Sequence, residues 1–304
     1  MPTQTVLSTS VVTTDHPRGQ KFVETCRAQY NKARLGEDAA QQLNESSGFA
    51  ADIAEAIRKH SRTKTEWYAN QVVRSSMTYP PEYQGPGMIV DQINKLSQIT
   101  GIDPSHALEF AGRLPPLHRL AEGFFAVASD EGLAAVHFSG IDDPDERRCR
   151  SVQFMLDQIK SSRLLYNYCD GQITPDRYRI YPDTAAALNL IAEQQKGGIW
   201  IIPAQLGMLH RGESVNRARE IFKLDEFGFG GLEVLSISST HPERLVRWEQ
   251  LHMDCSGDQF APGADGVFSL APLFYFDDDR VRFGTGGVDD AGDRYGSVSG
   301  FLPQ

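Results

Sequence analysis

The spacing of apolar residues predicts helices in the first 120 residues. One helix face is marked by four positions at three- and four-residue steps: Phe22, Cys26, Tyr30 and Ala33. The same period predicts a helix over 48–60 and another that runs from Ile89 to a glycine stop at Gly101. We therefore expect a mainly helical region over 20–120.

Before these helices, residues 1–19 alternate Ser and Thr with Val and Leu. This pattern predicts an extended arm. Its β-branched residues would allow the arm to pair with a sheet edge or with a neighbouring subunit.

From residue 121 onward, short apolar runs alternate with helical periods. The predicted elements are a hairpin of 123–127 with 133–138, a helix starting at 142–145, a helix over 183–195, a strand over 199–202, a helix over 214–222, a strand over 231–237 and a hairpin of 273–276 with 280–283. This mixture predicts an α+β class, in which a helical N-terminal half precedes a C-terminal half of helices and antiparallel hairpins. The end of this 121–304 region is expected to be acidic and rich in strands.

Charge and composition narrow the possible partners. The chain has 304 residues and a formal net charge of −10, which repels the phosphate backbone, so nucleic-acid binding is unlikely. No apolar run approaches the roughly 18–20 residues needed to cross a bilayer, and the first residues do not form a secretory signal. The cysteines form no C-x-x-C pair, which favours free thiols and a cytoplasmic location.

Four segments carry a resemblance to known sequences: IPAQLGMLHRGESVNRARE, THPERL, DCSGD and YGSVSGFLPQ. With these motifs, roughly residues 79–304 resemble a family of uncharacterised bacterial proteins. The resemblance implies a bacterial, non-secreted setting. It supplies no catalytic residues.

Carboxylates are concentrated at the C-terminal end. Residues 251–304 contain nine aspartates and no lysine. Asp254, Asp258 and Asp265 fall within the glycine-containing segment DCSGDQFAPGADG, and such oxygen ligands suit Ca²⁺ or Mg²⁺. The spacing does not match an EF-hand. The alternative is that these aspartates form turns by bonding to their own backbone. Other carboxylates of this end, 277–279 and 289–293, are expected to be solvated.

A second candidate site lies in the segment HRGESVNRAR. Ser214 is placed to cap the helix that follows, and a helix N-terminus favours anions. With His210, Arg211 and Arg217 close by in sequence, a phosphate or carboxylate could bind there. The alternative is an ordinary capped helix with a basic face.

Cysteine catalysis is a third possibility. Cys255 would need His252 or His241 as a base, and on a strand His252 would point to the opposite face. A buried structural cysteine is the simpler interpretation.

Two functions remain open from the sequence. The first is an acidic interaction or assembly protein with a protein partner or self-association and no catalytic motif of its own. The second is a metal-assisted hydrolase for a phosphoester-type substrate, which would combine the aspartate cluster with the His/Arg anion patch.

Overall fold

The computed structural model describes residues 17–46, 49, 52–53, 71–263 and 266–303. The chain divides into two compact units, Met1–Thr63 and Lys64–Gln304. None of the helices in the described residues is long and apolar enough to cross a membrane.

The first unit contributes α1 (Pro17–Ala33) and α2 (Glu37–Glu45). Because α1 begins at Pro17, the last residues of the predicted arm are helical, while residues 1–16 lie outside the described residues. Most of the helix predicted over 48–60 also lies outside them. The helix predicted from the apolar face of Phe22, Cys26, Tyr30 and Ala33 is α1. Phe22 and Tyr30 of this face are exposed.

In the second unit, described elements before residue 120 are helices, as the apolar spacing predicts. The helices of this unit are α5 (Ile89–Thr100), α6 (Ser105–Ala111), α7 (Asp130–His137), α8 (Pro144–Ser162), α9 (Pro182–Gln194), α10 (Val215–Ile221), α11 (Gly231–Thr240) and a short 3₁₀ turn (Pro242–Arg244). Its strands are β1 (Gly123–Ala128), β2 (Leu165–Asn167), β3 (Tyr178–Ile180), β4 (Ile199–Gln205), β5 (Glu226–Gly228), β6 (His252–Asp254), β7 (Asp258–Phe260), β8 (Leu270–Asp277), β9 (Arg280–Gly287), β10 (Tyr295–Ser297) and β11 (Ser299–Phe301). These elements form an α+β fold.

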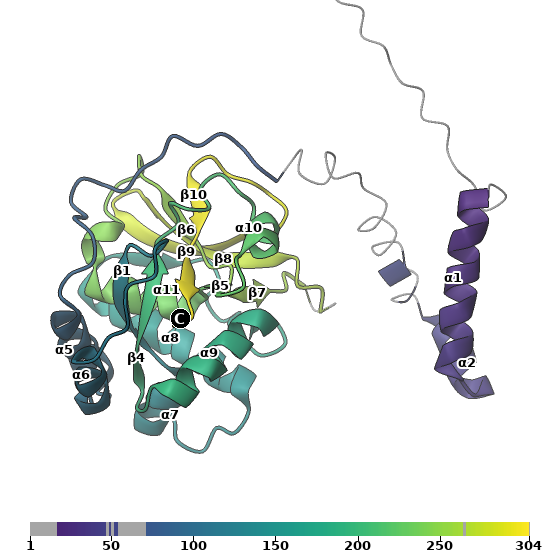
Figure 1. The fold of residues 1–304 in the computed structure, drawn as a ribbon, viewed down its shortest axis with the longest axis horizontal. Coiled ribbons are helices and arrows are strands. Elements are labelled where there is room, and N and C mark those ends of the chain that lie inside the picture. The colour runs from purple at the N-terminus through teal and green to yellow at the C-terminus, as the bar shows by residue number, and fades with distance from the viewer. Residues whose placement is uncertain (1–16, 47–48, 50–51, 54–70, 264–265, 304) are drawn as a thin grey trace, which may run out of the picture. The chain divides into compact units, whose positions relative to one another are not determined.

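Two sheets organise this unit (Figure 1). The smaller sheet has the strand order β1-β4-β11-β5, and β4 is buried along its whole length. The larger sheet joins β10, β6, β8, β7 and β3 in that order, with β9 paired to β8 and β2 paired to β9. The chain passes from the larger sheet to the smaller one at Val298, between β10 and β11.

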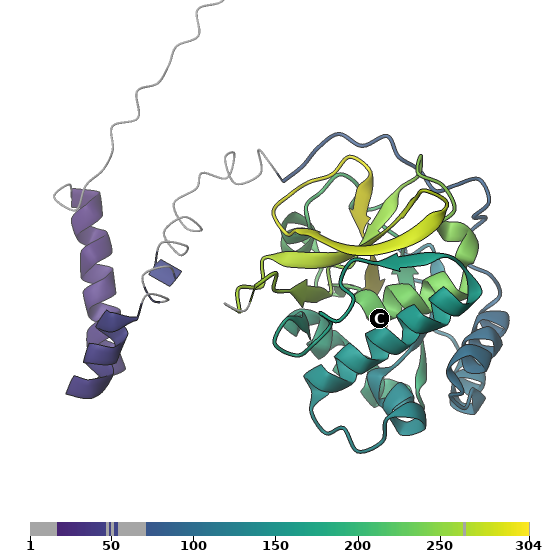
Figure 2. The ribbon, with the colours of Figure 1, turned by 180° about the vertical axis from the view of Figure 1, so that it is seen from behind.

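Helix α11 lies at the centre of the unit and packs against β1 and α8. Figure 2 shows α11 (green) beside the long helix α8 (teal), with the β8–β9 hairpin (yellow) running past them. Nearly every residue of α11 is buried, so the helix is covered by other elements around most of its circumference. Figure 1 shows α5 and α6 together on the flank of the unit next to β1 and β4.

Several predicted elements are confirmed. The helix ending at Gly101 does so with that glycine in the left-handed conformation, at φ 71°. The C-terminal hairpin pairs Asp277 with Arg280, and the two residues between them, Asp278 and Asp279, both have positive φ. That pair of angles is typical of a type I′ turn, whose twist matches the flanking strands.

Two predicted strands are wrong. Residues 133–137 belong to α7 and Phe138 follows its end, because the Ser129 side chain accepts a hydrogen bond from Gly132 N and so caps a helix immediately after β1. Strand β1 pairs with β4 instead. Residues 231–237 belong to α11, whose Glu233 carboxylate accepts from Gly230 N. Burial of nearly the whole helix weakens the amphipathic period that normally distinguishes a helix from a buried strand.

Candidate functional site: an acidic pocket beside Asp254

Strands β6 and β10 place four polar or aromatic side chains on one face of the larger sheet. The two strands are parallel, with Tyr295 opposite His252 and Ser297 opposite Asp254. Residues two apart on a strand share a face, and paired residues point to the same side. His252, Asp254, Tyr295 and Ser297 are therefore neighbours, although forty residues of sequence separate the two strands.

Asp254 is the most unusual group of this set. Asp254 is only 8% exposed. Among the described residues it has neither a hydrogen-bond partner nor an ion-pair partner. Burial raises the pKa of this carboxyl from 3.8 to about 7. An unpaired buried carboxylate is costly, and such groups are concentrated at functional sites.

Its neighbours are also unpaired. The Ser297 hydroxyl and both ring nitrogens of His252 are buried and make no hydrogen bond with the described residues. Burial, with Arg244 and Arg294 adding to it, lowers the pKa of His252 to about 3, so the ring is neutral at pH 7. Buried polar atoms are normally paired, so three unpaired groups on two adjacent strands mark this region as specialised.

Asp254 lines a pocket of about 230 Å³. The other lining residues come from α10, β8, β9, the 288–294 loop and β10, and they are Val215, Ala271, Leu273, Gly286, Gly287, Asp290, Ala291, Gly292 and Tyr295. Two of the glycines allow close packing of the wall. A Cβ on Gly292 would lie 2.8 Å from the Tyr295 ring, and one on Gly287 would lie 2.2 Å from an Asp290 carboxylate oxygen.

The lining is acidic and apolar at once. Asp254 and Asp290 are carboxylates, and no lysine, arginine or histidine is present among these lining residues. Val215 and Ala271 form a small cluster of buried apolar residues with Val288. The pocket thus offers negative charge together with apolar contact.

The structure does not show the three aspartates that were predicted to hold a metal ion in one common site. Both oxygens of Asp258 are occupied inside the unit, by Arg148, by the Tyr178 hydroxyl and by Gly231 N. Asp254 lies in the pocket, and Asp265 is outside the described residues. Within the described parts of the chain, no three His, Cys, Asp or Glu side chains are arranged to hold a metal ion. The Ca²⁺ or Mg²⁺ site stays a prediction.

Asp258 belongs to a buried ion cluster that the sequence analysis missed. The Arg148 guanidinium donates to Glu233 at 2.7 and 2.8 Å, to Asp258 at 3.0 Å and to Asp130 at 3.3 Å. Arg148 is 1% exposed. These contacts join α8, α11, β7 and the start of α7, so the cluster fixes the relative positions of these elements.

The predicted anion patch has a different arrangement from the one expected. His210 is buried, and its two ring nitrogens contact Glu213 at 3.0 Å and Glu226 at 2.7 Å. Burial lowers the pKa of His210, but the two carboxylates outweigh burial and raise it overall. This histidine is therefore already compensated by carboxylates.

The other three residues of the predicted anion patch each make a different contact. Ser214 caps α10, as predicted, by accepting from Arg217 N at 3.1 Å. Arg217 pairs with Glu220, and exposed Arg211 donates to the carbonyl of Met77. Each of these groups thus makes local contacts on or beside α10.

Cys255 is fully buried, and burial raises the pKa of its thiol well above the ordinary value. It follows the last residue of β6, so it points away from the face that carries His252 and Asp254. The other candidate base, His241, accepts a hydrogen bond from Gly87 N. The buried structural interpretation of this cysteine fits these contacts.

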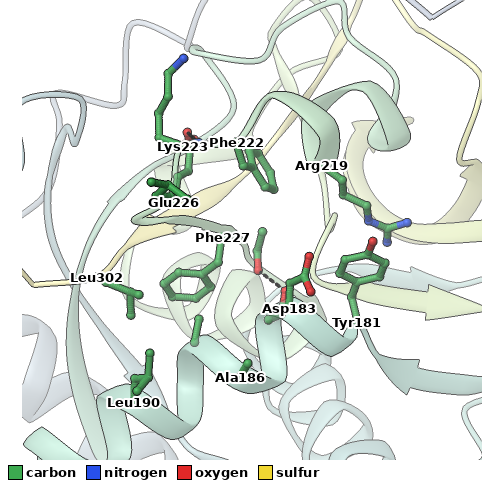
Figure 3. Close-up of a pocket in the computed structure, with 14 residues that line it drawn as sticks. Tyr181, Asp183, Ala186, Leu190, Arg219, Phe222, Lys223, Glu226, Phe227 and Leu302 are labelled. Atoms are coloured by element: carbon green, nitrogen blue, oxygen red, sulfur yellow. Dashed lines mark hydrogen bonds between the residues drawn. The ribbon is translucent and has the colours of Figure 1, made fainter. Parts of the chain in front are cut away.

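A second pocket of about 320 Å³ lies between α9 and α10 (Figure 3). Figure 3 shows Arg219 next to the ring of Tyr181, and the distance from guanidinium to ring centroid is 4.1 Å. Arg219 also donates to the carbonyls of Ser256 and Asp258. Glu226 in the same pocket accepts from Ser299 and contacts His210. The charged groups here are largely engaged, unlike Asp254.

A third pocket, of about 630 Å³, is lined by Tyr79, Tyr83, Glu122 and mainly apolar neighbours. Glu122 accepts from the Tyr79 hydroxyl and from Leu206 N. Both bonds are accepted by Oε1, so Glu122 has partners for one of its oxygens, whereas the Asp254 carboxylate has none among the described residues.

No protein-family model matches the chain, and neither does any curated protein or solved structure. The geometry of the acidic pocket is therefore the basis for a functional proposal.

Proposed function

We propose that this chain is a binding protein that recognises a positively charged amine, and that the pocket beside Asp254 is where the amine binds. Support comes above all from the Asp254 carboxylate, which is nine-tenths buried and has no partner among the described residues. The amine belongs either to a free small molecule or to a lysine side chain of a partner protein. Both sources present the same ammonium group.

Electrostatics favour an ammonium ligand. A carboxylate in a poorly solvated site gains far more from an opposite charge at contact distance than it would in water. The ammonium would donate to Asp254, and the unpaired Ser297 hydroxyl belongs to the residue paired with Asp254 in the sheet. Tyr295 adds an aromatic wall, against which cations are stabilised.

The apolar part of the lining favours an organic cation over a metal ion. Calcium requires about six to eight oxygen ligands, and magnesium usually keeps several waters in octahedral geometry. Val215, Ala271 and Leu273 provide no such ligands and instead suit a methylene chain. The pocket volume of about 230 Å³ is smaller than the roughly 300–1,000 Å³ of sites for drug-sized molecules.

Isothermal titration calorimetry on the full chain at pH 8 tests this proposal. The probes are n-butylamine and a short peptide with one internal lysine, each compared with n-butanol or with the acetyl-lysine peptide. We expect the amines to bind and their neutral counterparts not to bind. Binding of the peptide but not of butylamine would assign the site to a partner protein, and the reverse would assign it to a free amine.

Two variants locate the site. Asp254→Asn should reduce amine affinity at least about tenfold, because it removes a buried charge pair. Asp170→Asn, a change of the same chemistry at an exposed turn, should leave affinity unchanged. Absence of amine binding, or equal binding by Asp254→Asn, contradicts the proposal. Binding of Ca²⁺ or Mg²⁺ in place of amines would support the metal prediction instead.

A further inference from the structure

The acidic pocket contains two carboxylates at different depths. Asp254 is 8% exposed, whereas Asp290 is exposed and lies on the 288–294 loop. The Asp290 carboxylate folds back over Gly287, which a side chain there would prevent. Among the described residues, neither carboxylate has an ion-pair or side-chain hydrogen-bond partner. One pocket thus has an inner and an outer negative group.

Apolar surface lies in the same pocket as these two groups. Leu273 and Ala271 of β8, Val215 of α10 and the ring of Tyr295 line it. A chain of methylene groups would be buried against these side chains at a gain of about 0.8 kcal/mol per buried methylene. The combination therefore matches a ligand that is charged at both ends and apolar in between.

The surroundings of the outer group increase the negative potential. Asp289 and Asp293 are exposed on the same loop. The loop's one cation, Arg294, is directed elsewhere: its guanidinium lies 4.7 Å from the Trp248 ring centroid and donates to the Trp248 carbonyl. Exposed carboxylates near a pocket mouth attract cations and favour multiply charged ones.

We infer that the amine is a short linear α,ω-diamine, with its inner ammonium on Asp254 and its outer ammonium on Asp290. This inference depends on the proposed amine-binding function and specifies the chemical class of the ligand. The inner contact supplies most of the affinity because it is buried. The outer contact distinguishes a diamine from a monoamine of the same length.

The test compares 1,4-diaminobutane with n-butylamine by calorimetry on the full chain at pH 8. A symmetrical diamine has a statistical advantage of about two, and an exposed ion pair adds about two- to fivefold. We therefore expect the diamine to bind about four- to tenfold more tightly. Asp290→Asn should reduce this preference to about twofold, because only the statistical advantage of the diamine then remains.

Asp293→Asn provides a matched control. It removes the same charge from the same loop, but Asp293 does not line the pocket. The preference for the diamine should survive in this variant. If Asp293→Asn and Asp290→Asn reduce the preference equally, long-range charge explains it and the two-point contact is refuted.

The remaining outcomes separate the two proposals. Equal binding of diamine and monoamine, with both lost in Asp254→Asn, would overturn the diamine inference and leave the amine-binding function intact. Failure of both ligands to bind would overturn the proposed function itself. Binding of the diamine that persists in Asp254→Asn would refute the assignment of the inner ammonium to Asp254.

Discussion

Replacing Asp254 by Asn should stabilise the protein at neutral and alkaline pH. In the folded chain burial raises the pKa of this carboxyl from 3.8 to about 7. A folded state that binds the proton more tightly than the unfolded state is most stable at low pH. Its stability then declines as pH rises from about 4 to about 7 and is constant above that range. Asn stays neutral, so the variant lacks this decline.

The magnitude follows from the same shift. About three pKa units correspond to about 4 kcal/mol, at 1.36 kcal/mol per unit. This is an upper value, because part of the gain is offset by burying the Asn amide in its place. For a folded unit of this size, 1 kcal/mol moves the melting temperature by about 2–4 °C. We therefore expect Asp254→Asn to melt at most about 8–16 °C higher than the natural chain at pH 8, and at nearly the same temperature near pH 4.

Urea unfolding followed by circular dichroism between pH 4 and pH 9 measures this difference. Other buried carboxyls titrate in the same window, since burial also raises the pKa of Asp130 to about 6. Their contributions are common to both proteins and cancel in the difference between them. A difference in unfolding free energy that does not change with pH would refute the reasoning. So would an Asp254→Asn variant that is less stable than the natural chain at pH 8.

Three further outcomes follow from the same structure. The proposed amine should bind about 30-fold more tightly at pH 8.5 than at pH 5.5, because only about 3% of a carboxyl with a pKa near 7 is ionised at the lower pH; calorimetry at both values checks this, and equal affinities would exclude Asp254 as the counter-ion. Arg148→Met should lower the free energy of unfolding by about 3–5 kcal/mol, because three carboxylates lose their shared cation. A loss below about 1 kcal/mol in urea unfolding would show that the cluster is not structurally important. Gly207→Ala should destabilise the folded protein more than Gly140→Ala. Both glycines have positive φ, but only a Cβ on Gly207 would meet a backbone atom, at 2.8 Å from Gly296 O. Equal losses in thermal unfolding would contradict a steric role for this contact.

Local signals in the sequence predicted many of the elements. Gly101 ends α5 because glycine adopts the left-handed angle without a steric penalty, and this is visible from sequence. The serine that caps α10 and the hairpin between β8 and β9 are local in the same sense. Each of these features depends on residues only a few positions apart.

The helix α11 shows where local signals fail. Its apolar run resembles a buried strand because surrounding elements cover it on all sides, which no local period can indicate. The pattern over 133–138 is ambiguous for a related reason. The turn after β1 contains the serine and acidic residues of a helix start, yet the two apolar runs on either side of it favour a hairpin.

The candidate site was only partly visible from sequence. Asp254 stood out because aspartates are dense at the C-terminal end, but it was grouped with Asp258 by their short separation. In the folded chain Asp258 is neutralised by Arg148, more than one hundred residues earlier, while Asp254 has no such partner. Density of carboxylates could suggest cation binding, but it could not indicate which carboxylate was unpaired.

The sequence by itself determined the class of secondary structure, the negative net charge and several of the places where the chain turns, because these depend on composition and on neighbours along the chain. Only the tertiary structure decided which charges are compensated. Parallel pairing of β6 with β10 sets Ser297 and Tyr295 beside Asp254 and His252. The pKa of a buried group depends on solvent exclusion and on charges close in space, and both are set by folding.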